Sequence, residues 1–391
     1  MNTKPPYHLS SLLHAMELTD QRVLLRADLN VPLQNKEIIS DFRLQSTKPT
    51  LDLLQEKGAQ TLIVTHLGRP KNHEKSLSTN ILMKWFVKNK YDIVFAKTIE
   101  DAEIFFKQNK RLILLENIRF WPGEKKNDLS LAKALKKITD MYVMDAFGVA
   151  HRTDTTVTLL PELYQSSQRT IGLLVEKELK ELNRLLEKPK HPFLALLGGA
   201  KIETKLPLIE HLLPKIDTLA LLPALSFTFM KAQQQEIGKS LLISSLIPEA
   251  QKIIYQTTKL QKNLLLPLDY IVSDNGWESA DKYSAHIQKN ETAFGIGHKT
   301  VSSYAPYLQQ AQTILFNGIP GDLEYPKTMV ETKALLKQFC SSNAYKLAAG
   351  GDTIATIQKY HLESCFNFLS TGGGATLHYL SGKSLPGLLN F

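Results

Sequence analysis

Short apolar runs alternate with longer amphipathic segments along most of the chain, and this alternation limits the possible folds more than any other sequence feature. It is typical of repeated β-strand, α-helix, β-strand units, which form parallel sheets covered by helices. Candidate strands occupy residues 23–25, 61–64, 93–95, 112–115 and 142–144 in the first half, and 193–197, 218–222, 270–272, 313–316, 345–348 and 366–369 in the second. The sequence therefore predicts an α/β fold.

One amphipathic segment, residues 170–189, divides the chain. Leucines follow Val175 at helical spacing, charged residues such as Glu178 and Glu181 occupy the other face, and Pro189 ends the pattern. A length of 391 residues allows two or three domains. We expect two Rossmann-like lobes, each a parallel β-sheet flanked by helices, joined by a hinge helix. The predicted boundaries are 1–170 for the first lobe, 171–188 for the helix and 189–371 for the second lobe.

Arginine and glycine are distributed in opposite ways on the two sides of this segment. All arginines except Arg184 precede it, whereas the clustered glycines follow it, as Gly198-Gly199, Gly350-Gly351 and Gly372-Gly373-Gly374. A guanidinium group suits carboxylates and phosphates that side chains hold, and clustered glycines suit phosphates that backbone N–H groups hold. We infer two lobes that bind two different anions.

Polar and cationic residues directly follow four candidate strands of the first half. In an open parallel sheet, ligands bind beyond the carboxyl ends of the strands. A single surface arginine is more often solvated than ligand-binding, so we assign no role to Arg22 or Arg111. Strand-end placement favours substrate contact for four other residues: His66, Arg69, Arg119 and Arg152.

Three strands of the second half end in glycines that lead into helical segments, and this arrangement favours a nucleotide phosphate. Asp352 lies in one of these loops, where it can cap a helix or bind a metal. Gly238-Lys239-Ser240 resembles the end of a P-loop, but Gln233 stands where its first glycine is required. No dinucleotide fingerprint, serine-nucleophile elbow or zinc spacing occurs, which disfavours hydride transfer, acyl-serine chemistry and zinc hydrolysis.

The composition limits the expected binding partners and the expected cellular compartment. The formal charge is +9, but the lysines are scattered and no basic run interleaves with aromatics, so we expect a polyanionic small substrate and no nucleic acid. Cys340 and Cys365 lack metal spacing, which predicts plain buried thiols in a reducing cytoplasm. Residues 1–18 lack the apolar stretch of a signal peptide, and no run is long enough for a membrane span. We therefore expect a cytoplasmic protein with no membrane partner.

From about Val23 to Leu388, blocks of residues resemble phosphoglycerate kinase in the order and spacing of that family. The blocks are Asp28-Leu29-Asn30-Val31-Pro32, His66-Leu67-Gly68-Arg69-Pro70, Leu115-Glu116-Asn117-Ile118-Arg119-Phe120, Asp145-Ala146-Phe147-Gly148 with Ala150-His151-Arg152, Gly198-Gly199-Ala200-Lys201, Asn317-Gly318, Gly350-Gly351-Asp352-Thr353 and Ser370-Thr371-Gly372-Gly373-Gly374-Ala375. The resemblance implies reversible transfer of the acyl phosphate of 1,3-bisphosphoglycerate to Mg-ADP, giving 3-phosphoglycerate and Mg-ATP in glycolysis.

The resemblance also implies roles for individual residues. The phosphoglycerate site would consist of Asp28, Leu29, Asn30, Arg43, His66, Leu67, Gly68, Arg69, Arg119 and Arg152. The nucleotide site would consist of Gly199, Ala200, Lys201, Lys205, Asn317, Glu324, Gly350, Gly351, Asp352 and Thr353, with Asp352 as the ligand of Mg²⁺. The catalytic cations would be Arg43, Lys201 and Lys205.

We expect a monomer that bends at the hinge helix, because water at the reacting phosphorus would hydrolyse the acyl phosphate. The family likeness further implies a C-terminal segment, 372–391, that returns to the first lobe. Departures from the family pattern lie at Met144, Gly295, His298, Ile319-Pro320, Asp322 and Leu222-Pro223-Ala224-Leu225, the last where a glycine triplet is usual. All but Met144 lie on the nucleotide side, so we expect altered nucleotide affinity with intact 3-phosphoglycerate binding. The alternative is a catalytically impaired binding protein that retains the kinase fold.

Overall fold

The computed structural model describes residues 7–391, which form two compact units. The first unit extends to Lys180 and includes Ser384–Phe391, and the second unit is Glu181–Lys383. Residues 1–6, the start of the segment that we expected to lack a signal peptide, lie outside the described part. Residues 372–383, which we grouped with the returning segment, belong instead to the second unit, because α13 (Gly374–Leu380) packs against α7 (Ile202–Leu212).

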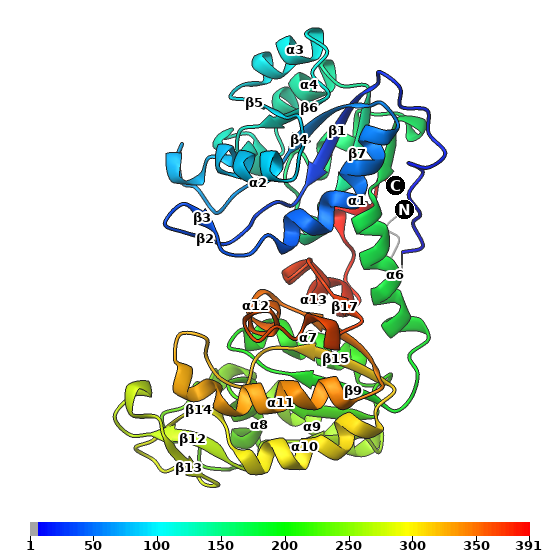
Figure 1. Cartoon of the computed structure of the whole chain (residues 1–391). Helices are drawn as coiled ribbons and strands as arrows, with labels where there is room; N and C mark the ends of the chain where they lie inside the picture. The colour runs from blue at the N-terminus through cyan, green and yellow to red at the C-terminus, as the bar shows by residue number, and fades with distance from the viewer. Residues whose placement is uncertain (1–6) are drawn as a thin grey trace. The chain divides into compact units, whose positions relative to one another are not determined.

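The first unit is built on a six-stranded, all-parallel sheet with the order β5-β6-β4-β1-β7-β8 (Figure 1). The strands are β1 (Arg22–Ala27), β4 (Gln60–Val64), β5 (Val94–Ala96), β6 (Leu112–Leu115), β7 (Met141–Asp145) and β8 (Arg169–Ile171). The central strands are buried on both faces, which explains their continuous apolar runs. A short hairpin, β2 (Leu33–Gln34) and β3 (Glu37–Ile38), follows β1.

Helices cover this sheet. On one face α1 (Phe42–Glu56) and α2 (Met83–Lys88) contribute Leu51, Trp85 and Phe86 to a core with side chains of β1, β4, β6 and β7. The unit also contains α3 (Ile99–Lys107), α4 (Leu129–Lys137) and α5 (Leu159–Glu162). Thr98 forms a capping box with Asp101 at the start of α3, and Asp128 caps α4. The predicted α/β fold is confirmed.

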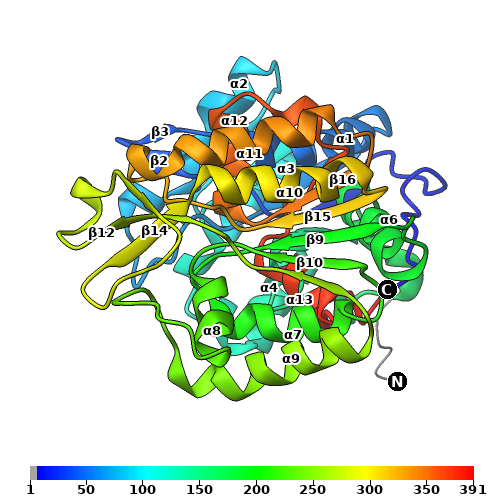
Figure 2. The same ribbon diagram turned by 90° about the horizontal axis from the view of Figure 1, so that it is seen from below.

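The second unit repeats this architecture with the strand order β11-β10-β9-β15-β16-β17, again all parallel. Its strands are β9 (Phe193–Leu197), β10 (Thr218–Leu221), β11 (Asn263–Leu265), β15 (Thr313–Asn317), β16 (Tyr345–Ala349) and β17 (Phe368–Leu369). One face is covered by α7, α8 (Leu225–Ala232) and α9 (Ile247–Lys259), and the other by α10 (His298–Gln310) and α11 (Val330–Ser341) (Figure 2). A further helix, α12 (Gly351–Lys359), follows β16.

The strand predicted at 270–272 exists, but it does not belong to the parallel sheet. As β12 (Tyr270–Ser273) it pairs antiparallel with β13 (Lys282–Ser284) and β14 (Thr292–Ile296) in a separate three-stranded sheet. This small sheet has its own core, in which Tyr270 and Val272 pack with Phe227 of α8. An apolar strand run is compatible with either kind of sheet, so the sequence could not distinguish them.

The segment at 170–189 is a helix for only part of its length. Residues Arg169–Ile171 form β8, and α6 runs from Leu173 to Glu187. The predicted apolar face is buried, but so is Glu178, which we placed on the exposed face. The boundary between the units lies within this helix, after Lys180. Among the helices of residues 7–391, none is both long and apolar enough to cross a membrane.

The prediction of two plain buried thiols is wrong. Cys340, at the end of α11, and Cys365, in the 3₁₀ turn Glu363–Cys365, form a disulfide, and Cys340 is exposed. The bond closes a loop across a sequence separation of 25 residues. Cysteines so far apart in sequence give no signal of their proximity, because the fold alone brings the two segments together.

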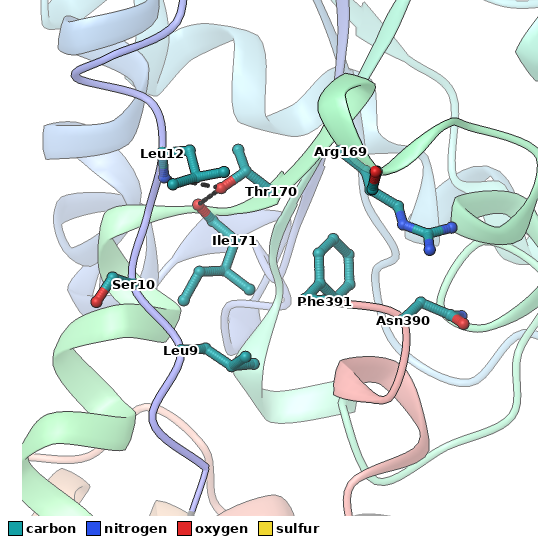
Figure 3. A pocket seen from close by; sticks show the side chains of 9 residues that line it. Leu9, Ser10, Leu12, Arg169, Thr170, Ile171, Asn390 and Phe391 are labelled. Atoms are coloured by element: carbon teal, nitrogen blue, oxygen red, sulfur yellow. Dashed lines mark hydrogen bonds between the residues drawn. The ribbon is translucent and has the colours of Figure 1, made fainter. Parts of the chain in front are cut away.

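The end of the chain packs within the first unit. The backbone N–H of Gly387 donates to the carbonyl of Ala150 at 2.9 Å, the Asn390 amide donates to the carbonyl of Thr158 at 3.0 Å, and the Phe391 ring stacks on Tyr142. Figure 3 shows the cavity of about 130 Å³ beside these residues, which Phe391, Asn390 and the segment around Leu12 line. None of the predicted site residues lines this cavity.

Candidate active site

Asp28 is the centre of a charged cluster at the carboxyl edge of the first sheet. It directly follows β1, and its carboxylate forms an ion pair with Arg43, in the first turn of α1. Its other oxygen lies 3.9 Å from Nδ1 of His66, which follows β4. Burial alone would raise the pKa of Asp28, but the positive charges around it, above all that of Arg43, lower the pKa to about 2. Asp28 is therefore an anion that holds the surrounding cations in place.

Arg119 lies in the same cluster with unused hydrogen-bonding capacity. Its Nη1 donates to the Gly68 carbonyl at 2.6 Å, while its Nε and Nη2 are buried and lack a hydrogen-bond partner among the described residues. Asp154 is 3.8 Å from Nη2, too far for a hydrogen bond. Burial and the charge of Arg152 lower the pKa of Arg119 to about 10, so the group remains cationic at neutral pH. Buried N–H groups without partners are suited to receive a carboxylate or a phosphate.

His66 is 2% exposed, and its Nδ1 has no hydrogen-bond partner in the described part of the chain. Burial lowers its pKa well below the ordinary value, despite the opposing effect of Asp28. The imidazole is therefore neutral near pH 7 and acts as a hydrogen-bonding group rather than as a cation.

Short hydrogen bonds fix the loops that carry these groups. The Asn30 side chain accepts from the backbone N–H of Gly68 at 2.7 Å, and Asn117 donates to the carbonyl of Leu67 at 2.7 Å. Leu29 and Leu67, which belong to these loops, are fully buried. The loops after β1, β4 and β6 thus form one connected rim.

The remaining predicted cations differ in placement. Arg152 is close enough for its charge to influence Arg119, whereas Arg69 is exposed on the loop after Gly68, without an ion pair or hydrogen bond to other described residues. Sequence reasoning missed Arg26, a fully buried residue of β1 whose charge contributes to lowering the pKa values of Asp28 and His66. An arginine within an otherwise apolar strand was the signal that could have identified it.

Arg26 also lies close to a second buried carboxylate, that of Glu124. Its Nε donates to the Thr156 hydroxyl at 2.8 Å, and its Nη2 lies 3.8 Å from Glu124. Burial raises the pKa of Glu124 to about 7, against the opposing charge of Arg26. Arg22 and Arg111, to which we assigned no role, lie elsewhere, with Arg111 paired to Asp20 on the surface.

The second unit brings glycine-containing loops together at the carboxyl edge of its sheet. The backbone N–H of Gly198, after β9, donates to the Asn317 carbonyl at 2.8 Å, and that of Gly318, after β15, donates to the Thr353 hydroxyl at 2.8 Å. Asn317 donates to the Ala349 carbonyl at 2.6 Å, and its own side-chain oxygen is buried without a partner among the described residues. Three predicted loops therefore meet at one place.

Close packing at this junction requires glycine at 318. Gly318 has φ +109°, and a Cβ there would overlap the backbone carbonyl of Gly198. By contrast, Gly199 and Gly351 face open space, where a Cβ would meet nothing within 4 Å. These two glycines therefore leave room beside the backbone, as phosphate-binding loops that precede helices do.

Lys205 is the buried cation of the second site. It lies in the first two turns of α7 and is only 6% exposed. Burial lowers its pKa to about 8, and the charge of Asp352 partly opposes this effect. Lys201, exposed at the start of the same helix, lowers it further. Lys205, Lys201 and Asp352 are therefore close enough to interact electrostatically.

Asp352 is exposed in the first turn of α12 and is the predicted metal ligand. No group of three or more acidic, histidine or cysteine side chains among residues 7–391 could hold a metal by itself. A single carboxylate is nevertheless what Mg²⁺ needs when phosphate oxygens supply most of its ligands. Glu324 is exposed on the segment after β15, and no side-chain hydrogen bond or ion pair joins it to other described residues.

The departures from the family pattern have structural consequences in the second unit. Ala224 adopts φ +68° and ψ −64°, a strained conformation for alanine, so the chain keeps a glycine-like backbone without glycine. Leu222 packs directly over Gly198, and Pro320 is buried. His298 is exposed at the start of α10, near the capping carboxylate of Asp269.

Comparisons with known proteins agree with this geometry. The family model described as phosphoglycerate kinase matches residues 13–383. A protein of Legionella pneumophila named phosphoglycerate kinase is 36% identical over 378 residues, which cover 95% of this chain and 94% of the relative. The relative with this name from Desulfovibrio desulfuricans is 36% identical over 380 residues, covering 95% and 96% of the two chains.

A solved structure gives the same result. The phosphoglycerate kinase of Coxiella burnetii superposes with a TM-score of 0.82 at 34% sequence identity, covering 96% of this chain and 97% of the other. Both the sequence and the architecture therefore match over almost their full length. This chain belongs to the phosphoglycerate kinase family.

Proposed function

We propose that the two sheet edges divide the substrates of a phosphoglycerate kinase between them. The first unit binds 3-phosphoglycerate or 1,3-bisphosphoglycerate, and the second binds Mg-ADP or Mg-ATP. The observation that carries this assignment is the contrast between buried guanidinium N–H groups without partners at Arg119 and the glycine loops around Asn317. The catalysed reaction is reversible phosphoryl transfer between the carboxyl group of 3-phosphoglycerate and ATP.

In the first unit, Arg119 and Arg152 bind the anionic groups of the phosphoglycerate, and the neutral His66 contributes a hydrogen bond. Asp28 positions Arg43, which neutralises charge on the transferring phosphoryl group. No general base is required, because a carboxyl group with a pKa of roughly 3 to 4 is already ionised near pH 7. The other predicted contacts are Asn30, Leu29, Leu67, Gly68 and Arg69.

In the second unit, Lys201 and Lys205 neutralise the nucleotide phosphates, and the amides of Gly199, Ala200, Gly350 and Gly351 donate to them. Asn317 and Thr353 contribute polar contacts, and Glu324 binds the ribose. Mg²⁺ held by Asp352 would supply a Lewis acid that neutralises phosphate charge. Bending at α6 that brings the two ligands together is part of this proposal. Small-angle scattering with and without both ligands tests it.

The decisive test is a coupled assay for consumption of ATP in the presence of 3-phosphoglycerate. A phosphoglycerate kinase turns over, while an impaired binding protein binds 3-phosphoglycerate without turnover. The comparisons give that alternative no support. The relatives are named phosphoglycerate kinase and align with this chain over nearly their whole length. We further propose a cytoplasmic monomer, which sedimentation and cell fractionation would test.

A further inference from the structure

The second unit has a hollow at the edge of its sheet opposite to the glycine loops. Its volume is about 690 Å³, within the usual range for small-molecule pockets. Residues just before or at the start of β9, β15, β16 and β17 line it, namely Lys190, Gln312, Tyr345 and Asn367, together with Arg184 of α6. Because the strands are parallel, this amino-edge pocket lies away from the residues assigned to the nucleotide.

Arg184 is held in a fixed orientation at this pocket. Its guanidinium carbon lies 3.8 Å from the centroid of the Tyr345 ring, and the Tyr345 hydroxyl donates to Glu181 at 2.5 Å. A guanidinium stacked on an aromatic face keeps its N–H edge available for an anion. Within residues 7–391, neither Arg184 nor Lys190 has an ion-pair partner. The pocket wall thus carries two cations and one carboxylate, that of Glu181.

Amide groups complete the lining. Asn367 accepts the backbone N–H of Lys346 at 2.8 Å through its side-chain oxygen, which leaves its NH₂ group as the donor available to a ligand. Gln312 and Asn343 are exposed at the same wall. The pocket therefore combines charged donors with neutral donors and acceptors.

The disulfide fixes two walls of this pocket relative to each other. Cys340 precedes Asn343 by three residues, and Cys365 precedes Asn367 by two. The buried Lys346 ammonium adds hydrogen bonds to the carbonyls of Ser342 and Phe339, at 2.5 and 3.0 Å. A binding site benefits from such rigidity, because less conformational freedom is lost when a ligand binds.

We propose that the amino-edge pocket binds a small anionic metabolite of the carboxylate or phosphate class. Guanidinium and ammonium groups recognise these anions by charge-assisted hydrogen bonds, and the amides suit hydroxyl or carbonyl groups around the charge. Arg184 already covers one face of the Tyr345 ring, so an aromatic ligand cannot stack on that face.

The test uses the full chain in calorimetric titrations with citrate as the carboxylate probe and pyrophosphate as the phosphate probe. Binding of at least one probe should weaken about tenfold in the double variant Arg184→Gln, Lys190→Gln, since two charge-assisted contacts are lost. The matched control is Lys188→Gln, which removes a neighbouring exposed lysine outside the pocket and should bind as the unmodified chain does. Turnover with 3-phosphoglycerate and ATP should be unchanged in all variants.

Equal affinity of the double variant and the unmodified chain for both probes would overturn the proposal. If the double variant does not fold, Asn343→Asp provides the second test, because it adds a negative charge to the same wall at an exposed position. This variant should weaken the same probe severalfold, and an unchanged isotherm would equally reject the pocket.

Discussion

The first unit builds its predicted anion site from side chains, whereas the second builds its site from backbone. Asp28, Arg43 and Arg119 are held in a network of mutual charges, so the first site is organised before any ligand arrives. In the second, Gly198 and Gly318 bring three loops together, and Lys205 is the buried cation. The first site therefore depends on charge pairing between side chains, whereas the second depends on the φ values that glycine permits and on close backbone packing.

The largest expected effect comes from removing one proposed catalytic cation in each unit. Arg43→Ala should lower kcat about 1,000-fold and leave the affinity for Mg-ADP unchanged. Lys201→Ala should lower kcat about 100-fold and leave the affinity for 3-phosphoglycerate unchanged. Steady-state kinetics and calorimetry measure both effects, with the surface variant Arg111→Ala as control. If either variant weakens both ligands equally, the division of substrates between the units is wrong.

Reduction of the disulfide should destabilise the second unit alone. The cross-link closes a loop of 25 residues, for which loop entropy predicts a loss of about 3 kcal/mol in the free energy of unfolding. Hydrogen exchange with and without dithiothreitol would locate the change. The double variant Cys340→Ser, Cys365→Ser should not respond to the reductant. Equal loss of protection in the first unit would contradict the prediction.

Matched glycine substitutions compare the two kinds of site directly. Gly318→Ala places a Cβ against the backbone of Gly198 and should cost about 3 kcal/mol of folding free energy. Gly68, in the first unit, also has a positive φ, +63°, but an added Cβ meets only the movable end of Leu77, 2.7 Å away, so Gly68→Ala should cost about 1 kcal/mol. Denaturant unfolding measures both. Equal costs would mean that the second site tolerates backbone shifts as readily as the first tolerates side-chain shifts.

The pH dependence of ligand affinity should also differ between the units. The folded-state pKa of Lys205 is about 8, below its ordinary value, so this lysine loses its proton as the pH rises through 8. Affinity for ADP should fall about tenfold between pH 7 and pH 9, with proton uptake on binding, if the phosphate requires the protonated amine. In the first unit, the pKa of Asp28 is about 2, that of Arg119 about 10, and that of His66 well below 6.5.

Affinity for 3-phosphoglycerate should therefore be nearly constant between pH 7 and pH 9. The control is Lys205→Met, which should bind ADP more weakly at pH 7 and lose the decline toward pH 9. Calorimetry in buffers of different ionisation enthalpy measures the proton uptake. A decline that persists in Lys205→Met would assign the titration to another group.

Sequence reasoning located the strand ends well because their signals are local. The glycines that precede α7, α12 and α13, and the polar residues after β1, β4 and β6, are adjacent in sequence to the strands that position them. Apolar runs such as Leu112–Leu115 mark buried parallel strands by their composition alone. The fold and the two strand-edge clusters were therefore predictable from the sequence.

The errors concern contacts between distant segments. The disulfide joins Cys340 to Cys365, and β12 pairs with strands that no local pattern identifies. Glu178 is buried in α6 although its spacing indicated an exposed face. A strained backbone with positive φ, as at Ala224, cannot be recognised from the residue type. Such features depend on the tertiary environment, which overrides local periodicity.

The smallest expected effect tests whether backbone strain at Ala224 lowers nucleotide affinity. Ala224 occupies φ +68°, so Ala224→Gly should relieve strain and raise the free energy of unfolding by about 1 kcal/mol, despite the greater entropy of the unfolded glycine chain. The matched control, Ala232→Gly near the end of α8, should instead destabilise by up to about 1 kcal/mol. If the Cβ of Ala224 narrows the base pocket, ADP and GDP should both bind more tightly to Ala224→Gly, while 3-phosphoglycerate affinity stays constant. Unchanged nucleotide affinity with increased stability would show that the strain at Ala224 does not affect nucleotide binding and that the altered loop does not reach the base.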